Sequence, residues 1–187
     1  MFIHYRTWAF VLGTKEIGES DRLIYLFTRD YGLLEILGKA IRKISSKLKY
    51  GVQDFCFGEI EFIQGKRFKI LTDVYLVKNP NAIKKDLRKL RIAYAISDLT
   101  LEFIKQPEED RNLWDLLEIS LRLTGAWQRN VYLIYQFFFW NFLKLAGFGL
   151  DFSRCFVCQK KLKPQPDFIF TNQGIVCFQC APKLRKK

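Results

Sequence analysis

Histidine is almost absent from this chain of 187 residues, and so are the motifs of common catalytic sites. The single histidine, His4, cannot supply the two metal ligands of an H-E-x-x-H helix, and there is no glycine-rich phosphate loop and no G-x-S-x-G turn. Glu16, Glu19 and Asp21 could hold Mg²⁺ as in a nuclease, although an ion pair with the adjacent Arg22, or a capping role, is the simpler interpretation. We therefore expect no enzyme.

Signals for secretion and for a membrane are also missing. The N-terminus, MFIHYRTWAF, lacks the basic start, long apolar centre and cleavage site of a signal peptide. The longest apolar stretch, Val131–Leu150, contains Gln136, Asn141 and Lys144, which a membrane-spanning helix tolerates poorly. A membrane span and a buried central helix are the alternatives, and we favour the buried helix. The chain is therefore expected in the cytoplasm, without membrane contact.

Acidic residues are outnumbered, and the excess of positive charge is the main compositional feature. Against 31 lysines and arginines stand 19 acidic residues, which gives a formal net charge of +12 and a pI near 9.5. Such a charge favours an anionic partner, either nucleic acid or an acidic membrane surface.

Cysteine is sparse but concentrated near the C-terminus. Four of the five cysteines form two C-x-x-C pairs separated by 18 residues, namely Cys155, Cys158, Cys177 and Cys180. Two such pairs can close a tetrahedron of thiolates around one Zn²⁺. Disulfides or a redox C-x-x-C are the alternatives, but nothing else in the chain suggests secretion. Because four thiolates fill the coordination shell, we expect one structural zinc ion, with a hairpin between the pairs formed by Phe168–Phe170, the turn Thr171–Gly174 and Ile175–Val176.

Residues 1–79 have the pattern of a small β-domain. The pattern predicts five strands, at Tyr5–Leu12, Leu23–Thr28, Leu33–Leu37, Phe55–Gln64 and Phe68–Val77. Five strands in so short a segment suggest a closed barrel; the OB-fold is the usual candidate and an SH3-like barrel competes with it. Trp8 and Tyr5 could stack on bases, but strand aromatics are more often core, and we prefer the core interpretation.

Beyond Asn79-Pro80-Asn81 the apolar period changes to about 3.6, and Asn81 can cap a helix. Three helices are predicted, over residues 82–105, 111–125 and 130–145. The fold class is therefore α+β, with an OB-fold domain at 1–79, a helical domain at 80–150, and a zinc module with a basic tail at 151–187.

The segment between Glu35 and Asp54 contains no acidic residue. This segment, which we call the basic loop, carries five cations: Lys39, Arg42, Lys43, Lys47 and Lys49. Ser45 and Ser46 can donate to phosphate oxygens. A basic groove beside strand aromatics is how OB-folds hold single strands, so we predict DNA contact here, the alternative being a solvated loop. A second basic edge is predicted at the hairpin residues Lys66, Arg67 and Lys69.

A further cluster of cations crowds the start of the first long helix, namely Lys84, Lys85, Arg88, Lys89 and Arg91. The helix dipole disfavours cations at this end, which suggests a use for them. A solvated helix face remains the alternative.

Taken together, these pieces resemble a known family. Ala9–Gly32, with Glu-Ser-Asp-Arg between two apolar strands, and the basic segment Lys39–Phe55 are followed by a helical middle and two C-x-x-C pairs. The order and content over residues 1–180 resemble the bacterial DNA repair protein RecO family.

The resemblance implies an OB-fold, a helical domain and a zinc module. It also implies a recombination mediator that binds single- and double-stranded DNA, anneals complementary strands and helps to load the RecA recombinase onto strands coated by single-strand-binding protein, at the bacterial nucleoid. The implied partners are RecR and the acidic tail of the single-strand-binding protein, which docks on the helical domain in the family. A protein-interaction adaptor that uses its helical domain is the rival hypothesis.

Two departures from the family pattern stand out. The family's Lys-Gly-Ala reads Lys39-Ala40-Ile41 here, which predicts a loop without a positive-φ turn and with a different path. The chain also ends seven residues after Cys180, where the resemblance implies further helices, so we expect either a short or a truncated member.

Overall fold

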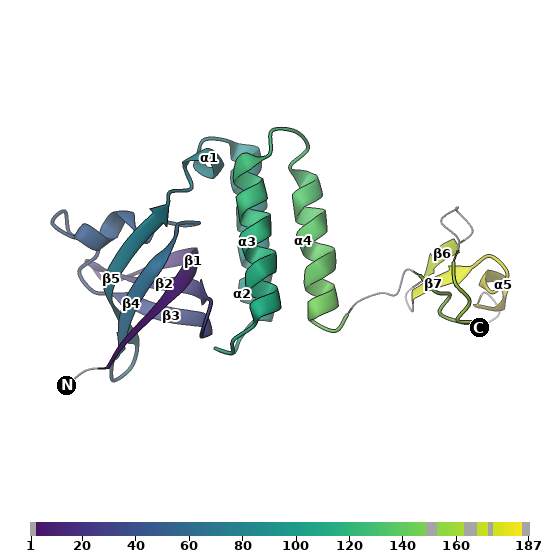
Figure 1. Cartoon of the computed structure of the whole chain (residues 1–187), viewed down its shortest axis with the longest axis horizontal. Coiled ribbons are helices and arrows are strands. Elements are labelled where there is room, and N and C mark those ends of the chain that lie inside the picture. The colour runs from purple at the N-terminus through teal and green to yellow at the C-terminus, as the bar shows by residue number, and fades with distance from the viewer. Residues whose placement is uncertain (1–2, 149–152, 163–167, 172–173, 185–187) are drawn as a thin grey trace. The chain divides into compact units, whose positions relative to one another are not determined.

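The computed structural model describes residues 3–148, 153–162, 168–171 and 174–184 (Figure 1). The chain divides into two compact units, Met1–Phe142 and Leu143–Lys187, and each is described by itself.

The first unit begins with a five-stranded closed barrel, which confirms the predicted OB-fold. Its strands are β1 (His4–Ile17), β2 (Asp21–Thr28), β3 (Gly32–Gly38), β4 (Phe57–Gln64) and β5 (Lys69–Lys78). They follow each other around the barrel in the order β1-β2-β3-β5-β4, and β4 closes onto β1. Only the β3–β5 pair is parallel; the other four pairs are antiparallel. Apolar residues that alternate along the strands fill the interior.

β1 runs beyond its predicted end at Leu12. It bends at a register shift between Val11 and Gly13 and then pairs with β2 as far as Ile17. At the bend, the backbone of Val11 bonds instead to the chain before β4: its N–H donates to Cys56 O at 2.9 Å and its carbonyl accepts from Phe55 N at 2.8 Å. A long, bent strand can pair on both edges, and this closes the barrel.

The helical part consists of α1 (Asn81–Lys84), α2 (Leu87–Phe103), α3 (Arg111–Ala126) and α4 (Tyr132–Leu145). The first predicted helix is therefore broken in two. Asp86 adopts an extended backbone and its carboxylate accepts from Arg88 N at 2.9 Å, so it caps α2 and ends the preceding turn. Asn81 is not the cap that was predicted, because it is the first residue of α1 and Pro80 occupies the cap position without a side-chain bond.

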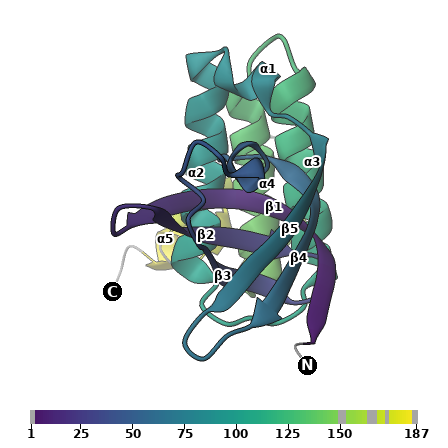
Figure 2. The ribbon, with the colours of Figure 1, turned by 90° about the vertical axis from the view of Figure 1, so that its left-hand side faces the viewer.

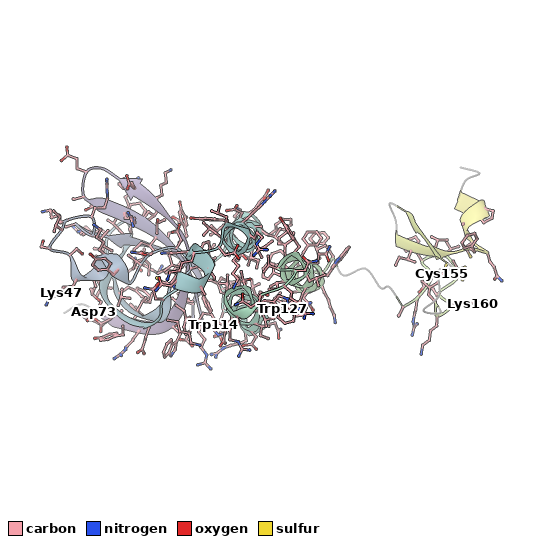
Figure 3. All side chains as sticks on the ribbon, turned by 90° about the horizontal axis from the view of Figure 1, so that it is seen from above. Lys47, Asp73, Trp114, Trp127, Cys155 and Lys160 are labelled. Atoms are coloured by element: carbon pink, nitrogen blue, oxygen red, sulfur yellow. The ribbon has the colours of Figure 1, made fainter. Side chains whose placement is uncertain are left out.

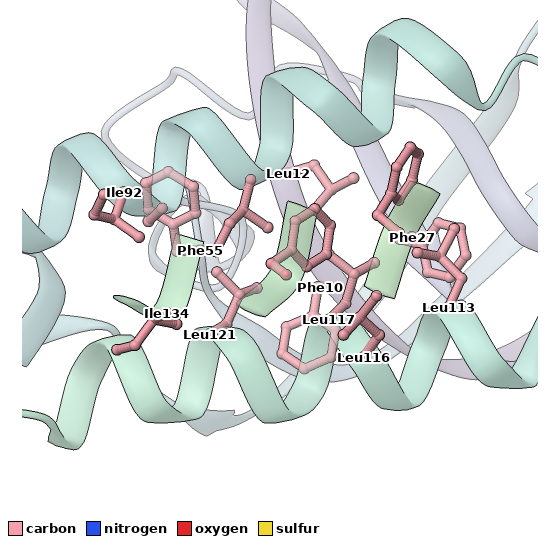
Figure 4. Packing of buried hydrophobic residues seen from close by; sticks show 14 of the residues in the cluster. Phe10, Leu12, Phe27, Phe55, Ile92, Leu113, Leu116, Leu117, Leu121 and Ile134 are labelled. Atoms are coloured by element: carbon pink, nitrogen blue, oxygen red, sulfur yellow. The ribbon is translucent and has the colours of Figure 1, made fainter. Parts of the chain in front are cut away.

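The barrel and the helices share one hydrophobic core. Phe10, Leu12, Phe27 and Phe55 point outward from the barrel and pack against α2 and α3 (Figure 4). Their helical partners include Ile92, Leu113, Leu117 and Leu121. An ion pair also joins the barrel to the helices, because the Arg111 guanidinium on α3 lies 3.3 Å from the carboxylate of Asp30, between β2 and β3. The barrel is thus fixed against the helices, and any surface between them has a defined shape.

α4 is not the buried central helix that its apolar sequence predicted. α2 and α3 lie between it and the barrel (Figure 1). Ile134, Phe138 and Phe142 are buried against them, whereas Leu133, Phe137 and Trp140 are 43–54% exposed. The barrel, rather than a helix, covers the other side of α2 and α3, which leaves α4 outside. No described helix combines the length and the hydropathy needed to cross a bilayer.

The second unit contains a short hairpin, β6 (Phe168–Thr171) and β7 (Gly174–Cys177), and a final turn of helix, α5 (Ala181–Leu184). The two strands pair antiparallel, which confirms the predicted hairpin. The middle of its predicted turn, Asn172 and Gln173, lies outside the described residues.

Candidate nucleic-acid surface and metal centre

The basic loop crosses the barrel and is anchored at both ends. Ile41 and Val52 are fully buried in the barrel core. Between them, the N–H of Arg42 donates to Ser20 O at 3.0 Å. The prediction that Ala40 would avoid a positive-φ turn is wrong: its φ is 52°. Its N–H donates to the Asp21 carboxylate at 2.7 Å, and this bond holds the alanine in a conformation that glycine would adopt more easily.

Anchoring leaves most of the loop cations free. Lys39, Lys43 and Lys47 are exposed, Lys49 is half-buried, and none forms an ion pair with a described residue. Arg42 differs, because its guanidinium pairs with Glu16 at 3.2 Å and donates to Gly18 O at 3.3 Å. Four of the five predicted loop cations are therefore available to an anion, and Arg42 also ties the loop to the β1–β2 turn.

The second basic edge lies on the strand beside the start of the basic loop. β5 begins beside the end of β3, where Lys69 pairs with Ile36 and Ile70 with Leu37. The two strands run parallel, so the chain leaves β3 after Gly38 in the direction away from the β4–β5 turn that bears Lys66 and Arg67; Figure 2 shows that turn at the lower end of β5 and the basic loop above it. The loop's short helix η1 (Lys47–Tyr50) lies against β5, since a Cβ on Gly51 would stand 2.6 Å from Val74.

Two apolar side chains within this basic surface were missed by the sequence reasoning. Ile44 is 99% exposed and Tyr50 is 69% exposed. Tyr50 follows Lys49 directly, and an exposed aromatic ring among cations has the chemistry needed to stack on a base. The available signal was an aromatic residue inside a basic segment, but the pattern alone does not show which rings face solvent.

The helix-start cations are mostly engaged within the protein. Lys89 is 5% exposed, and its ammonium donates to Gly125 O at 2.7 Å near the end of α3. Arg88 pairs with Asp86 at 2.9 Å, and Lys84 donates to the Gln53 side chain at 2.6 Å. Their role in holding the helices favours a structural interpretation.

Two of the three carboxylates considered for Mg²⁺, Glu16 and Asp21, are also engaged. Glu16 pairs with Arg22 at 3.7 Å and with Arg42 at 3.2 Å, as the simpler interpretation predicted. Asp21 accepts from Ala40 N.

The two strand aromatics occupy different environments. Tyr5 belongs to the barrel interior, where it stacks on Phe62 at 5.3 Å between ring centroids. Trp8 lies on the outer side of β1, half-buried, and stacks on Phe57 at 5.2 Å.

In the second unit, the four cysteines of the C-x-x-C pairs converge. Their sulfurs all lie within 4.8 Å of one another, and the Cys158 and Cys177 Sγ atoms are 3.9 Å apart. A tetrahedral ion with bonds of about 2.3 Å to sulfur would set its ligands roughly 3.8 Å apart, so the spacing fits one metal ion and excludes a disulfide. The donors are held by the backbone, since Gln159 N donates to Cys155 O at 2.8 Å and Cys177 N donates to Cys155 Sγ at 3.4 Å.

Burial and hydrogen bonding give Cys155 and Cys180 different pKa values. Burial opposes ionisation of Cys155, but hydrogen bonds from the backbone of Cys158 and Cys177 outweigh it and lower the pKa to about 6. Burial, together with hydrogen bonds among the four thiols, raises the pKa of Cys180 to about 12. Thiols so close together resist losing all their protons unless a cation is present, which is what a metal ion supplies.

Comparison with known proteins assigns the family. The family model described as recombination protein O N terminal matches residues 1–80, and the one described as recombination protein O C terminal matches residues 84–185. The chain belongs to the RecO family. This family acts in DNA repair and recombination.

Several RecO relatives match over most of this chain. The DNA repair protein RecO of Clostridium novyi is 26% identical over 176 residues, which cover 94% of this chain and 69% of the relative. That of Clostridium kluyveri is 27% identical, with coverage of 94% and 68%. That of a Dehalococcoides mccartyi strain is 27% identical over 180 residues, with coverage of 94% and 70%.

Proposed function

We propose that this chain is a non-catalytic recombination mediator that binds single- and double-stranded DNA, anneals complementary strands and helps to load RecA onto strands coated by single-strand-binding protein. The observation that carries the proposal is the basic loop, because its unpaired lysines stand on an OB-fold barrel beside an exposed tyrosine. Membership of the RecO family supports the same function.

The proposed DNA contacts are the free loop lysines and the hairpin at the start of β5. Lys39, Lys43, Lys47 and Lys49 would neutralise phosphates, together with Lys66, Arg67 and Lys69, while Tyr50 stacks on a base. Arg42 would contribute positive potential while it holds the loop to Glu16.

We propose zinc as the ion held by Cys155, Cys158, Cys177 and Cys180. Four thiolates at tetrahedral spacing are the usual donor set of a structural zinc ion. The ion would hold the second unit folded and would take no part in DNA chemistry.

RecR and the acidic tail of single-strand-binding protein are the proposed protein partners, supported by the family alone. An adaptor function is the second candidate. It is favoured by one observation, the exposed apolar side chains Leu133, Phe137 and Trp140 on α4.

An annealing assay tests the proposal. Complementary strands, bare or coated with single-strand-binding protein, are mixed with the protein, with and without EDTA added at the start of the reaction. We expect faster annealing on both substrates, independent of EDTA on the time scale of the assay. Absence of annealing together with retained binding to the tail peptide would favour the adaptor, and strand cleavage that needs Mg²⁺ would show an enzyme.

A further inference from the structure

A second surface with binding chemistry lies where the barrel meets α3, away from the basic loop. It is a cleft of about 490 Å³, here called the junction cleft, lined mainly by Trp8, Arg29, Phe57, Lys78, Trp114 and Glu118. It adjoins a smaller apolar pocket of about 190 Å³ that shares Phe57, Lys78 and Glu118. Figure 3 shows Trp114 at the helices and Lys47 of the basic loop at the far side of the barrel.

Aromatic rings form one wall of the junction cleft. Trp8 and Phe57 are stacked, with ring centroids 5.2 Å apart and planes inclined by 18°. Trp114 stands 6.1 Å from Phe57 and is buried beneath it. Trp8 and Phe57 both remain partly exposed, so a planar group entering the cleft can extend an existing stack.

Two free cations flank this stack. Arg29 and Lys78 are exposed, and neither is ion-paired within the described part of the chain. The Lys78 ammonium lies 6.0 Å from the centre of the Phe57 ring. Arg111, which also lines the cleft, is by contrast engaged by Asp30 and Glu109. The free charges therefore stand beside the aromatic rings, where phosphates on either side of a stacked base would pass.

The cleft also contains acceptors, Asp115 and Glu118. Carboxylates repel phosphates but accept hydrogen bonds from the exocyclic amino groups of bases. A ring stack, flanking cations and carboxylate acceptors together match the parts of a nucleotide. An acidic peptide would also satisfy the cations and the apolar wall, and its backbone N–H groups could donate to the carboxylates, but it has no amino group fixed in the plane of a stacked ring.

We propose that the junction cleft binds a nucleotide of single-stranded nucleic acid: the base stacks on the Trp8–Phe57 pair, and Arg29 and Lys78 contact the neighbouring phosphates. This inference rests on the proposed DNA-binding function, to which it adds a second contact beyond the basic loop. Bases that carry an exocyclic amino group, such as cytosine, are favoured there over thymine.

The test uses tryptophan fluorescence in the full chain. In a Trp127→Phe/Trp140→Phe background, which replaces two rings that are 45% and 46% exposed, Trp8 and Trp114 are the reporters. We expect oligo(dC) to quench this fluorescence as it binds. We expect Arg29→Gln/Lys78→Gln to reduce the quenching and to weaken binding, with a salt slope lower by about 1.4, because each lost phosphate contact to a single strand contributes roughly 0.7. The matched control, Arg91→Gln/Arg129→Gln, removes the same charge outside the cleft and leaves the quenching intact.

Further arms separate the possible failures. Absence of any oligonucleotide binding by the unaltered protein would overturn the proposed function. The cleft proposal alone would be overturned by a different pair of results. Replacing the loop lysines would abolish binding, while the Arg29→Gln/Lys78→Gln variant and its control would bind oligo(dC) with equal affinity and equal quenching. The cleft assignment also fails if the Arg29/Lys78 variant loses an acidic, aromatic-containing peptide while keeping oligo(dC). Glu118→Met, which removes the acceptor oxygens, should reduce any preference for oligo(dC) over oligo(dT), and an unchanged preference contradicts the role given to the carboxylate.

Discussion

The two units of this chain differ in what fills their interiors. In the first, barrel and helices bury aromatic and aliphatic side chains in two clusters, with Phe27, Phe62 and Phe138 fully inaccessible. In the second, the buried cluster consists of Cys155, Val176 and Cys180 among the described residues. A cluster of this size offsets little of the entropy of ordering a chain. The first unit therefore folds by apolar burial, and we infer that the second relies on the metal ion proposed for its four cysteines.

The largest expected effect is loss of the second unit without loss of the first. Replacing a ligand, Cys155→Ser, should abolish metal binding and unfold residues 153–184, because structural zinc contributes about 10–16 kcal/mol in small metal-dependent folds. Metal content and hydrogen exchange of each unit measure this. Cys56→Ala, which alters the one cysteine outside the cluster, should leave the metal content unchanged. Equal protection of both units in the Cys155 variant would contradict the comparison.

The converse experiment damages the apolar core. Phe27 is fully buried between barrel and helices, so Phe27→Ala should destabilise the first unit by about 3–5 kcal/mol. Denaturant unfolding followed by circular dichroism measures this, and metal content should not change. Phe137→Ala removes the same atoms from a ring that is 43% exposed and should cost far less. Similar losses from both variants would mean that burial does not determine stability here.

A smaller effect is expected at the buried ammonium of Lys89. Lys89→Met keeps most of the side-chain volume but leaves Gly125 O without its donor, so the first unit should lose about 1–3 kcal/mol. Arg91→Gln, at an exposed neighbour, should change stability by less than about 0.5 kcal/mol. If the two variants unfold alike, Lys89 belongs to the solvated helix face and not to the core.

The smallest effect depends on pH. Hydrogen bonds from Arg88 lower the pKa of Asp86 from 3.8 to about 2. A carboxylate whose pKa is lower in the folded state stabilises the fold above its unfolded pKa, and this contribution is lost as the pH falls from 3.8 through 2. Asp86→Ala should therefore unfold more easily than the unaltered protein at neutral pH, and the difference should shrink over that window. Asp86→Asn keeps a capping oxygen, so its stability should lie between those of the unaltered protein and Asp86→Ala. A difference that persists at low pH would exclude the carboxylate as its source.

Much of this architecture was predictable because local patterns determine it. Strand alternation predicted the five-stranded barrel, and cysteine spacing predicted the cluster of four thiols. Element ends were less predictable. The bend of β1 at Val11 depends on Phe55 and Cys56, more than forty residues away in sequence, and the break at Asp86 required a capping side chain within an otherwise helical period.

The candidate sites were less predictable, because charge in the sequence does not indicate which partners a side chain meets. Arg42 was predicted to contact DNA and Lys89 was one of the helix-start cations for which a use was suggested, yet Arg42 pairs with Glu16 and Lys89 donates to Gly125 O. No role was predicted for Tyr50, which is exposed beside the lysines. The apolar sequence of α4 predicted a buried central helix. Instead, the outward-facing phenylalanines of the barrel pack on α2 and α3, so these two helices are the central ones.

The central claim is that the basic loop binds DNA through its free lysines, and a salt titration tests it most directly. Binding of a fluorescent oligonucleotide is measured by anisotropy at several salt concentrations for the unaltered protein and for Lys39→Gln/Lys43→Gln/Lys47→Gln. A control variant, Lys85→Gln/Lys105→Gln/Lys144→Gln, removes the same charge from exposed positions outside the barrel. With a single-stranded oligonucleotide, we predict a steep salt dependence for the unaltered protein and the control, and a slope lower by about two for the loop variant, or roughly 0.7 for each lost phosphate contact. Equal affinity and equal slope in the loop variant and the unaltered protein would contradict the claim.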